Sequence, residues 1–114
     1  ADRWMDWQTT SYSPSMVDAF MQLVRTPEDQ RDAERIERSR KAAERMSAIL
    51  DAVLARQPYV AGQRFTMADI ACGCATHRWL GLPLDRPARP NLERWMATLR
   101  DRRAAQEVLA LPVV

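Results

Sequence analysis

Phe65-Thr66-Met67-Ala68-Asp69-Ile70 is the stretch that decides the fold of this 114-residue chain. Thr66 is a suitable N-cap, and Asp69 follows three residues later, where its carboxylate can accept a hydrogen bond from the Thr66 backbone N–H. Together they predict a capping box, with Asp in place of the commoner Glu. Phe65 before the cap and Ile70 after it can close a hydrophobic staple. The stretch therefore predicts a helix start whose N–H groups are satisfied without water.

The helix that follows, residues 67–80, is mostly apolar, so we expect it to be buried. Leaving a buried donor unpaired costs about 1–3 kcal/mol, and the cap alone predicts a loss of that size for Asp69→Ala. Cys72 and Cys74 lie two apart in this helix and point to different faces, which disfavours a disulfide. We expect both to be small core residues of a reducing cytoplasm rather than nucleophiles, which need exposed, electropositive surroundings.

Two proline signals predict where the N-terminal helices begin and end. Residues 2–12 predict a helix with a bulky face, and Ser13-Pro14 predicts a kink or a restart, with Ser13 as cap and Pro14 at the first position. Thr26-Pro27 predicts a second start, followed by a long charged helix from residue 27 to about residue 56.

The C-terminal part predicts further helices and no strands. Pro90-Asn91 opens a helix, and a short last helix is expected over residues 104–110. One face of the first of these carries apolar side chains at helical spacing: Leu92, Trp95, Met96 and Leu99. With only three glycines and few β-branched residues, the chain predicts an all-α bundle of five to six helices.

Charge and composition exclude several classes of function. The net charge of +2 does not call for a nucleic-acid partner, and we expect none. Residues 78–103 carry seven arginines against three acids, which indicates either a site for an anionic partner or, as the favoured interpretation, a solvated helix face. No apolar run is long enough to span a membrane. The chain has no metal-ligand cluster, no Gly-rich phosphate loop and no catalytic constellation.

Several motifs, taken together, resemble one family. Tyr59-Val60-Ala61-Gly62 followed by residues 65–70 resembles the signature of the glutathione S-transferase C-terminal domain. Three further matches occur in the same order as in that family: Arg3-Trp4-Met5-Asp6-Trp7, Arg25-Thr26-Pro27-Glu28 and Pro90-Asn91-Leu92-Glu93-Arg94-Trp95. The resemblance covers essentially residues 1–114 and implies the helical bundle of that domain.

The resemblance implies a larger protein around this chain. Members of the family join a thioredoxin-like N-terminal domain, which binds glutathione and activates its thiol, to a helical domain that supplies most of the electrophile pocket and part of the homodimer interface. Nothing here resembles the thioredoxin-like half. We therefore expect a fragment of a longer two-domain protein, with the thiol-activating residue outside this chain.

Site residues follow from the resemblance position by position. The substrate-binding positions of bacterial relatives match Tyr12, Ser13, Met16 and Trp79. Asp6 matches a residue that contacts glutathione held by the partner subunit; alternatively, it stabilises the start of its own helix. Ser13-Pro14 departs from the pattern by placing a hydroxyl and a rigid bend where relatives have a basic group. Arg102-Arg103-Ala104 departs from the common Arg-Pro-Ala, which predicts that helix runs on there.

Two functions remain open. The first is a cytoplasmic, dimeric detoxification enzyme that conjugates glutathione to hydrophobic electrophiles, with this domain selecting the substrate; the chain alone is then expected to be inactive. The second is a non-catalytic protein-interaction module of the same fold. The Trp4-Met5-Asp6-Trp7 opening favours the enzyme, and the arginine excess over residues 78–103 favours the module.

Overall fold

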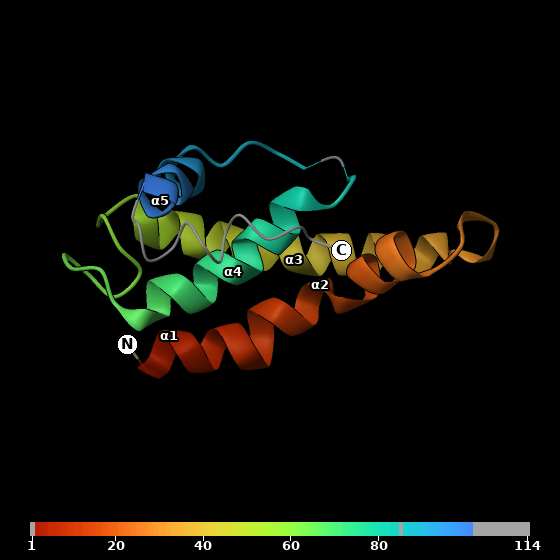
Figure 1. Ribbon diagram of the computed structural model, residues 1–114, viewed down its shortest axis with the longest axis horizontal. Coiled ribbons are helices and arrows are strands. Elements are labelled where there is room, and N and C mark those ends of the chain that lie inside the picture. The colour runs from red at the N-terminus through yellow and green to blue at the C-terminus, as the bar shows by residue number, and fades with distance from the viewer. Residues whose placement is uncertain (1, 85, 102–114) are drawn as a thin grey trace.

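Helices account for nearly all regular structure in the computed structural model, which describes residues 2–84 and 86–101 (Figure 1). Their order along the chain is α1 (Asp2–Trp7), the π-helical segment η1 (Gln8–Tyr12), α2 (Ser13–Phe20), the π-helical segment η2 (Met21–Arg25), the 3₁₀ turn η3 (Glu28–Gln30), α3 (Ala33–Leu54), α4 (Met67–Gly81) and α5 (Pro90–Asp101). Within the described ranges the only β-type pairing is an isolated bridge between Tyr59 and Gly62.

Helix α4 lies in the middle of the bundle. It packs against α1 and η1 on one side and against α5 on another, while α3 packs against both α2 and α5 (Figure 1). Its buried residues include Ala68, Cys72, Gly73, Ala75 and Trp79. The predictions of an all-α bundle and of a buried central helix are confirmed.

The first four segments form one uninterrupted helical run over residues 2–25. The described residues therefore make four separate helices and one 3₁₀ turn, fewer than the five to six predicted. The predicted last helix at residues 104–110, and the departure at residues 102–104, lie outside the described residues.

Of the two outcomes predicted at Ser13-Pro14, a kink or a restart, the restart with Ser13 as cap is wrong. Ser13 has helical dihedral angles (φ −61°, ψ −45°), and its hydroxyl accepts a hydrogen bond from Gln8 Nε2 instead of capping a new helix. Pro14 removes one backbone donor, but the preceding π turn lets the Ser13 N–H bond back to the Gln8 carbonyl. Widening the helix by one residue at η1 thus accommodates the proline without ending the helix.

Ser39 of α3 fixes the crossing of α3 with α2. Its buried hydroxyl accepts a hydrogen bond from the Ala19 N–H at 3.0 Å and donates one to the Ser15 carbonyl oxygen at 2.6 Å. These are the two backbone groups that an i→i−4 hydrogen bond of α2 would join. A side chain from a neighbouring helix that enters the ladder in this way holds the two helices in one register.

We expect Ser39→Ala to lower the free energy of unfolding by about 2 kcal/mol, because it removes both hydrogen bonds from a buried contact. Urea unfolding measures the change. Ser47→Ala is the matched control, because Ser47 is buried in the same helix but donates only to the carbonyl of its own Glu44, at 3.0 Å. Equal losses in the two variants would contradict the bridging role of Ser39.

The long helix begins later than predicted. Thr26 and Pro27 are extended, with ψ of 132° and 145°, and are followed only by the turn η3. Asp32 is the actual N-cap of α3, and its Oδ1 accepts from the N–H groups of Glu34 at 3.0 Å and Arg35 at 3.3 Å. A carboxylate that accepts two orphan N–H groups is a stronger cap than the threonine, so the start signal at Thr26-Pro27 was misleading.

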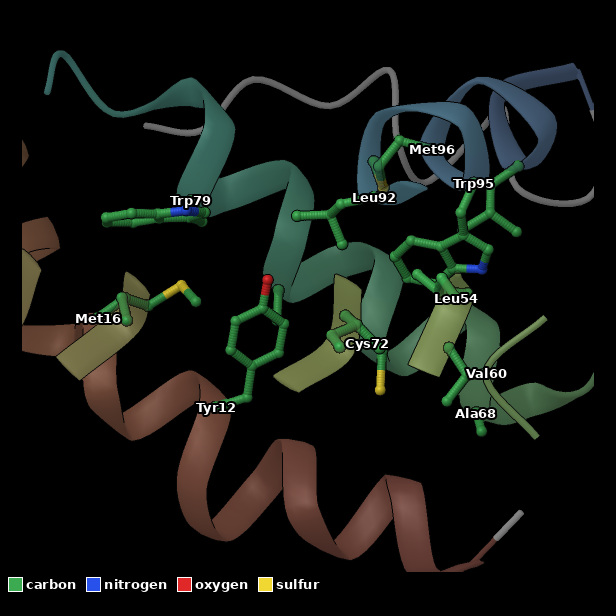
Figure 2. Packing of buried hydrophobic residues seen from close by; sticks show 14 of the residues in the cluster. Tyr12, Met16, Leu54, Val60, Ala68, Cys72, Trp79, Leu92, Trp95 and Met96 are labelled. Carbon is green, nitrogen blue, oxygen red and sulfur yellow. The ribbon is translucent and has the colours of Figure 1, made fainter. Parts of the chain in front are cut away.

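Helix α5 packs as its sequence predicts, with Leu92, Trp95, Met96 and Leu99 buried against the rest of the core. Figure 2 shows the first three of these side chains. Its approach to α4 is close at Gly73, where an added Cβ would lie 2.8 Å from Leu99 Cδ1. A side chain at this position would therefore require the end of the Leu99 side chain to move.

Cys72 is fully buried and Cys74 only partly so, and both thiols are free. The prediction that both cysteines lie in the core thus holds fully for Cys72 and in part for Cys74.

On the first helix, Val17 and Met21 continue the apolar pattern but are each 47% exposed. No helix among the described residues is both long enough and apolar enough to cross a membrane.

Candidate functional site

Asp69 is a buried hydrogen-bonding centre and not only a cap. The predicted capping box with Thr66 is present, and Asp69 Oδ2 accepts the Thr66 N–H at 2.8 Å. The second bond of the capping box runs from the Asp69 backbone N–H to the Thr66 side chain. It is the weaker of the two, because the same N–H bonds to the Thr66 carbonyl at 3.0 Å. Oδ1 accepts two further donors, the Val60 N–H at 3.0 Å and the indole Nε1 of Trp95 at 2.9 Å. One carboxylate therefore ties a loop, the start of α4 and α5 together.

The loop that presents Val60 is held by a tight turn. Tyr59 and Gly62 exchange backbone hydrogen bonds of 3.1 and 3.2 Å, and Gly62 has a φ of +141°, which strongly favours glycine. Phe65 is half-buried, and its ring meets that of Tyr59 edge-on at 6.1 Å. The staple contact between Phe65 and Ile70 stays a prediction.

Sequence reasoning missed Trp95 as a partner of Asp69. A signal was available: a buried indole N–H usually needs an acceptor, and Asp69 is the only fully buried acid among the described residues. Pairing the two still required knowing that α5 crosses the start of α4.

Tyr12 and Met16, two of the predicted substrate-binding residues, lie in the core with no exposed surface. The Tyr12 hydroxyl lies 2.7 Å from Thr76 Oγ1, and Thr76 in turn donates to the Cys72 carbonyl at 2.9 Å, so Tyr12 acts as the donor to Thr76. The Tyr12 ring also stacks on Trp7, with 4.9 Å between ring centroids. A substrate contact by Tyr12 or Met16 would require this packing to open.

Burial sets the acid–base properties of this region. It raises the pKa of the Tyr12 phenol above its ordinary value, and it raises the pKa of the Cys72 thiol to about 12, with the nearby Asp69 charge adding to the effect. Cys72 is therefore protonated at neutral pH, which fits the prediction that it is not a nucleophile. The described residues contain no group of three potential metal ligands.

Ser13 and Asp6 lie on the same helical run as Tyr12 but are more accessible. Ser13 is half-buried, and Asp6 is exposed, with no hydrogen-bond or ion-pair partner for its carboxylate among the described residues. Asp6 is the fifth residue of α1, beyond the first turn, where the helix dipole acts most strongly. Stabilisation of its own helix start is therefore the weaker of the two roles considered for Asp6.

Trp79 borders a cavity of about 490 Å³ between the end of α4, the connector to α5 and the start of α5. The cavity is lined by Trp79, Leu80, Leu84, Arg86, Pro87, Ala88, Arg89, Leu92 and Glu93. In Figure 2, Trp79 lies on the same side of the core as Met16, away from Trp95. None of Tyr12, Ser13 and Met16 lines this cavity, so the predicted substrate-binding residues do not converge on it.

Arg86 is a fixed part of the cavity wall. Its guanidinium lies 5.4 Å from the Trp79 ring centroid and donates to the carbonyls of Leu82 at 3.0 Å, Leu84 at 3.1 Å and Leu80. These contacts place a cation at the C-terminal end of α4, where the helix dipole favours positive charge. Burial lowers the pKa of Arg86 from its ordinary value. The sequence of residues 78–103, the arginine-rich segment, favours a solvated helix face. For Arg86 that interpretation is wrong.

Comparison with known proteins agrees with the fold and with the family resemblance of the sequence. The family model described as glutathione S-transferase, C-terminal domain, matches residues 33–98. Glutathione S-transferase GstB of Escherichia coli K12 is 36% identical over 113 residues, which is 99% of this chain and 54% of that protein. The disulfide-bond oxidoreductase YfcG of the same strain is 25% identical over 94% of this chain and 49% of its own length.

A solved structure gives the same result in three dimensions. The theta class glutathione S-transferase from Xanthomonas axonopodis pv. citri with glutathione bound matches with a TM-score of 0.93 and 41% identity, over 99% of this chain and 55% of that one. The chain thus spans about half the length of the curated relatives it matches. It belongs to the glutathione S-transferase family, of which it forms the C-terminal helical domain.

Proposed function

We propose that this chain is the electrophile-binding and dimerisation domain of a cytoplasmic glutathione transferase, which conjugates glutathione to hydrophobic electrophiles in detoxification. The observation that carries the proposal is the match, over 99% of the chain, to a bacterial transferase structure that contains glutathione. Residues 1–114 would form one helical domain of a two-domain protein. A thioredoxin-like domain would hold glutathione as co-substrate and activate its thiol.

The described residues divide the remaining tasks. Ser13 on the first helix would face the electrophile. Tyr12, Met16 and Trp79, which are buried, would support that surface from the core. In a homodimer, the exposed carboxylate of Asp6 would pair with the γ-glutamyl ammonium of glutathione in the partner subunit. No described residue forms an ion pair with the Asp6 carboxylate, which supports this role.

The surface of the first helix also supports an interface. Val17 and Met21 lie one turn apart on one face, and each is 47% exposed. Neighbouring exposed apolar side chains of this kind are common where a second subunit or domain packs.

One observation favours the alternative, a non-catalytic interaction module. The guanidinium groups of Arg25 and Arg78 lie 5.9 and 5.2 Å from the ring centroid of Phe20, and neither forms an ion pair with a described residue. A half-buried aromatic ring beside two such cations is suited to an acidic protein partner.

Assays with glutathione and a panel of chromogenic electrophiles separate the two functions. We expect the full-length protein to conjugate and the isolated chain to show no turnover, because thiol activation would lie outside residues 1–114. In the full-length enzyme, Asp6→Asn should raise the KM for glutathione about three- to tenfold with little change in kcat, since it removes binding that the ground state and the transition state share.

Asp18→Asn is the matched control, because Asp18 is an exposed acid on the same helical run. The absence of turnover by the full-length protein across the panel would favour the interaction module. Conjugation by the isolated chain, or equal KM values for the Asp6 and Asp18 variants, would contradict the division of tasks proposed here.

A further inference from the structure

Helix α3 runs along the length of the bundle (Figure 1), and one of its faces carries a straight row of largely basic side chains. The members of this row recur at alternating intervals of three and four residues, which places them on one line along the helix. The row covers about 30 Å and, apart from Ala42, its members are exposed. We call it the arginine stripe, and it consists of Arg35, Arg38, Ala42, Arg45, Ile49, Ala52 and Arg56, the last in the turn after the helix.

The positive charge of the arginine stripe is largely free of partners. Arg38, Arg45 and Arg56 form no side-chain hydrogen bond and no ion pair with any described residue. Arg35 has one exposed ion pair, of 3.8 Å, with Asp32. Exposed pairs of this kind stabilise a protein little. All four cations therefore remain available to a partner.

The acids of α3 are mostly engaged on other faces of the helix. Glu37 and Glu44 bind Arg40. Asp51 accepts a backbone hydrogen bond of 2.9 Å from the first turn of α5. Glu34 forms no ion pair with a described residue, but it lies beside the first arginine of the stripe. The excess of positive charge is therefore greatest toward the C-terminal end of α3.

Two hollows lie along the arginine stripe. The first, of about 480 Å³, lies between α2 and α3, where Arg35 and Arg38 outnumber Asp18, the one acid in its described lining. The second, of about 430 Å³, lies at the end of α3 and is lined by Ile49, Ala52, Val53, Arg56 and Gln57. Ile49 is 45% exposed. The second hollow suits an apolar side chain of a partner, with a cation beside it.

This combination of features fits a second helix. Side chains spaced alternately by three and four residues form the line along which two helices pack. Ala42 and Ala52 are small, so a partner helix can come close to α3. Acidic side chains on that helix complement the arginines, and an apolar one fills the hollow at Ile49.

Other occupants fit the arginine stripe less well. A nucleic acid would match the arginines, but its phosphates leave the apolar hollow empty. Insertion into a membrane surface needs several large apolar side chains on one face, and the stripe exposes only Ile49. A second copy of the chain, related by a twofold axis, would set arginine against arginine.

We propose that the arginine stripe docks an acidic amphipathic helix of a protein partner. Acidic side chains of that helix pair with the four arginines, and one apolar side chain fills the hollow at Ile49. The inference is independent of the transferase proposal, because the stripe lies on another helix from Ser13 and requires no glutathione. The stripe is also a different surface from the two arginines at Phe20.

A designed acidic peptide tests the docking surface. The probe is a helix of about 24 residues, long enough to span the stripe, with glutamates opposite the four arginines and leucines opposite Ile49 and Ala52. The control peptide has glutamine in place of each glutamate. Fluorescence anisotropy with the chain, at pH 7 and low salt, should give a Kd below about 0.1 mM for the acidic peptide and about tenfold weaker binding for the control. Added salt should weaken binding of the acidic peptide, because it screens exposed charges.

Three substitutions locate the binding surface. Arg45→Glu, in the middle of the stripe, should weaken binding of the acidic peptide by about tenfold or more. Arg64→Glu is the matched control, because Arg64 is an exposed arginine before α4 without an ion pair to a described residue, and it should change the Kd by less than about twofold. Ile49→Gln should weaken binding about threefold, because it makes the hollow polar. All three positions are exposed, so we expect the variants to fold, and urea unfolding verifies this.

In ¹⁵N-resolved NMR spectra, the acidic peptide should shift the amide signals of Arg38, Arg45 and Ile49 and leave that of Phe20 in place. Equal binding of the two peptides, equal effects of Arg45→Glu and Arg64→Glu, shifts centred on Phe20, or no binding up to about 1 mM would each overturn the proposal. Duplex DNA and phosphatidylserine vesicles are the further probes. Tighter binding of either one than of the peptide, lost in Arg45→Glu, would assign the stripe to a nucleic acid or a membrane instead.

Discussion

Asp69→Ala is expected to lower the free energy of unfolding by about 4 kcal/mol, more than the cap alone predicts. The substitution leaves three donors without their acceptor: the buried N–H of Val60, the buried indole of Trp95 and the partly buried N–H of Thr66. Each such loss costs about 1–3 kcal/mol, and the sum is reduced because the folded state no longer has to bury a charge. Urea unfolding measures the loss, and the m-value should be unchanged.

Two single variants and one double variant test the network. Asp18→Ala, which removes an exposed acid, should change stability by less than about 0.5 kcal/mol. Trp95→Phe, which removes one donor, should cost about 1–2 kcal/mol. Because Trp95→Phe also removes a donor that Asp69→Ala leaves unpaired, the double variant should lose less than the sum of the two single losses. Additive losses, or a loss for Asp69→Ala no larger than for Asp18→Ala, would contradict the network.

Alkaline pH is expected to destabilise the chain strongly, starting near pH 9. Burial raises the pKa of Cys72 from 9.0 to about 12, and it also raises that of Tyr12. In the folded state both groups therefore keep their protons at pH values where the unfolded chain releases them. Their contribution to stability is fully present below the unfolded pKa values and is lost as the pH rises above them.

The size of the effect follows from about 1.4 kcal/mol for each pH unit above the unfolded pKa. At pH 11, Cys72 should account for a loss of about 3 kcal/mol and Tyr12 for a further 1 kcal/mol or so. Unfolding free energies measured from pH 7 to pH 11 test this.

Cys72→Ala should flatten the pH dependence from pH 9 upward, and Tyr12→Phe should flatten it from about pH 10. Cys74→Ala is the matched control. Cys74 is only partly buried, and Arg78 opposes the rise in its pKa, so its removal should change the slope less. If the curves of all three variants run parallel to that of the unmodified chain, buried protonation of Cys72 and Tyr12 is not the cause.

The candidate site was predictable only in part. The family motifs indicated Asp6 and Ser13, and the structure leaves Asp6 exposed and Ser13 half-buried. The same motifs indicated Tyr12, Met16 and Trp79, which the fold buries. A sequence pattern indicates which face of a helix is apolar, but not whether another helix already covers that face.

The sequence by itself determined the local features: the capping box at Thr66 and Asp69, the buried helix α4, the apolar face of α5 and the family. Such features depend on side chains within a few residues of one another. Tertiary structure alone decided that Ser39 bridges α2, that Trp95 completes the bonds of Asp69, and that Arg86 holds the wall of the Trp79 cavity. The Ser39 and Trp95 contacts join residues twenty or more positions apart, so their partners are set by how the helices cross, which no local pattern specifies. Arg86 bonds to carbonyls only two to six residues away, and its position is set by the path of the connector that folds back on α4.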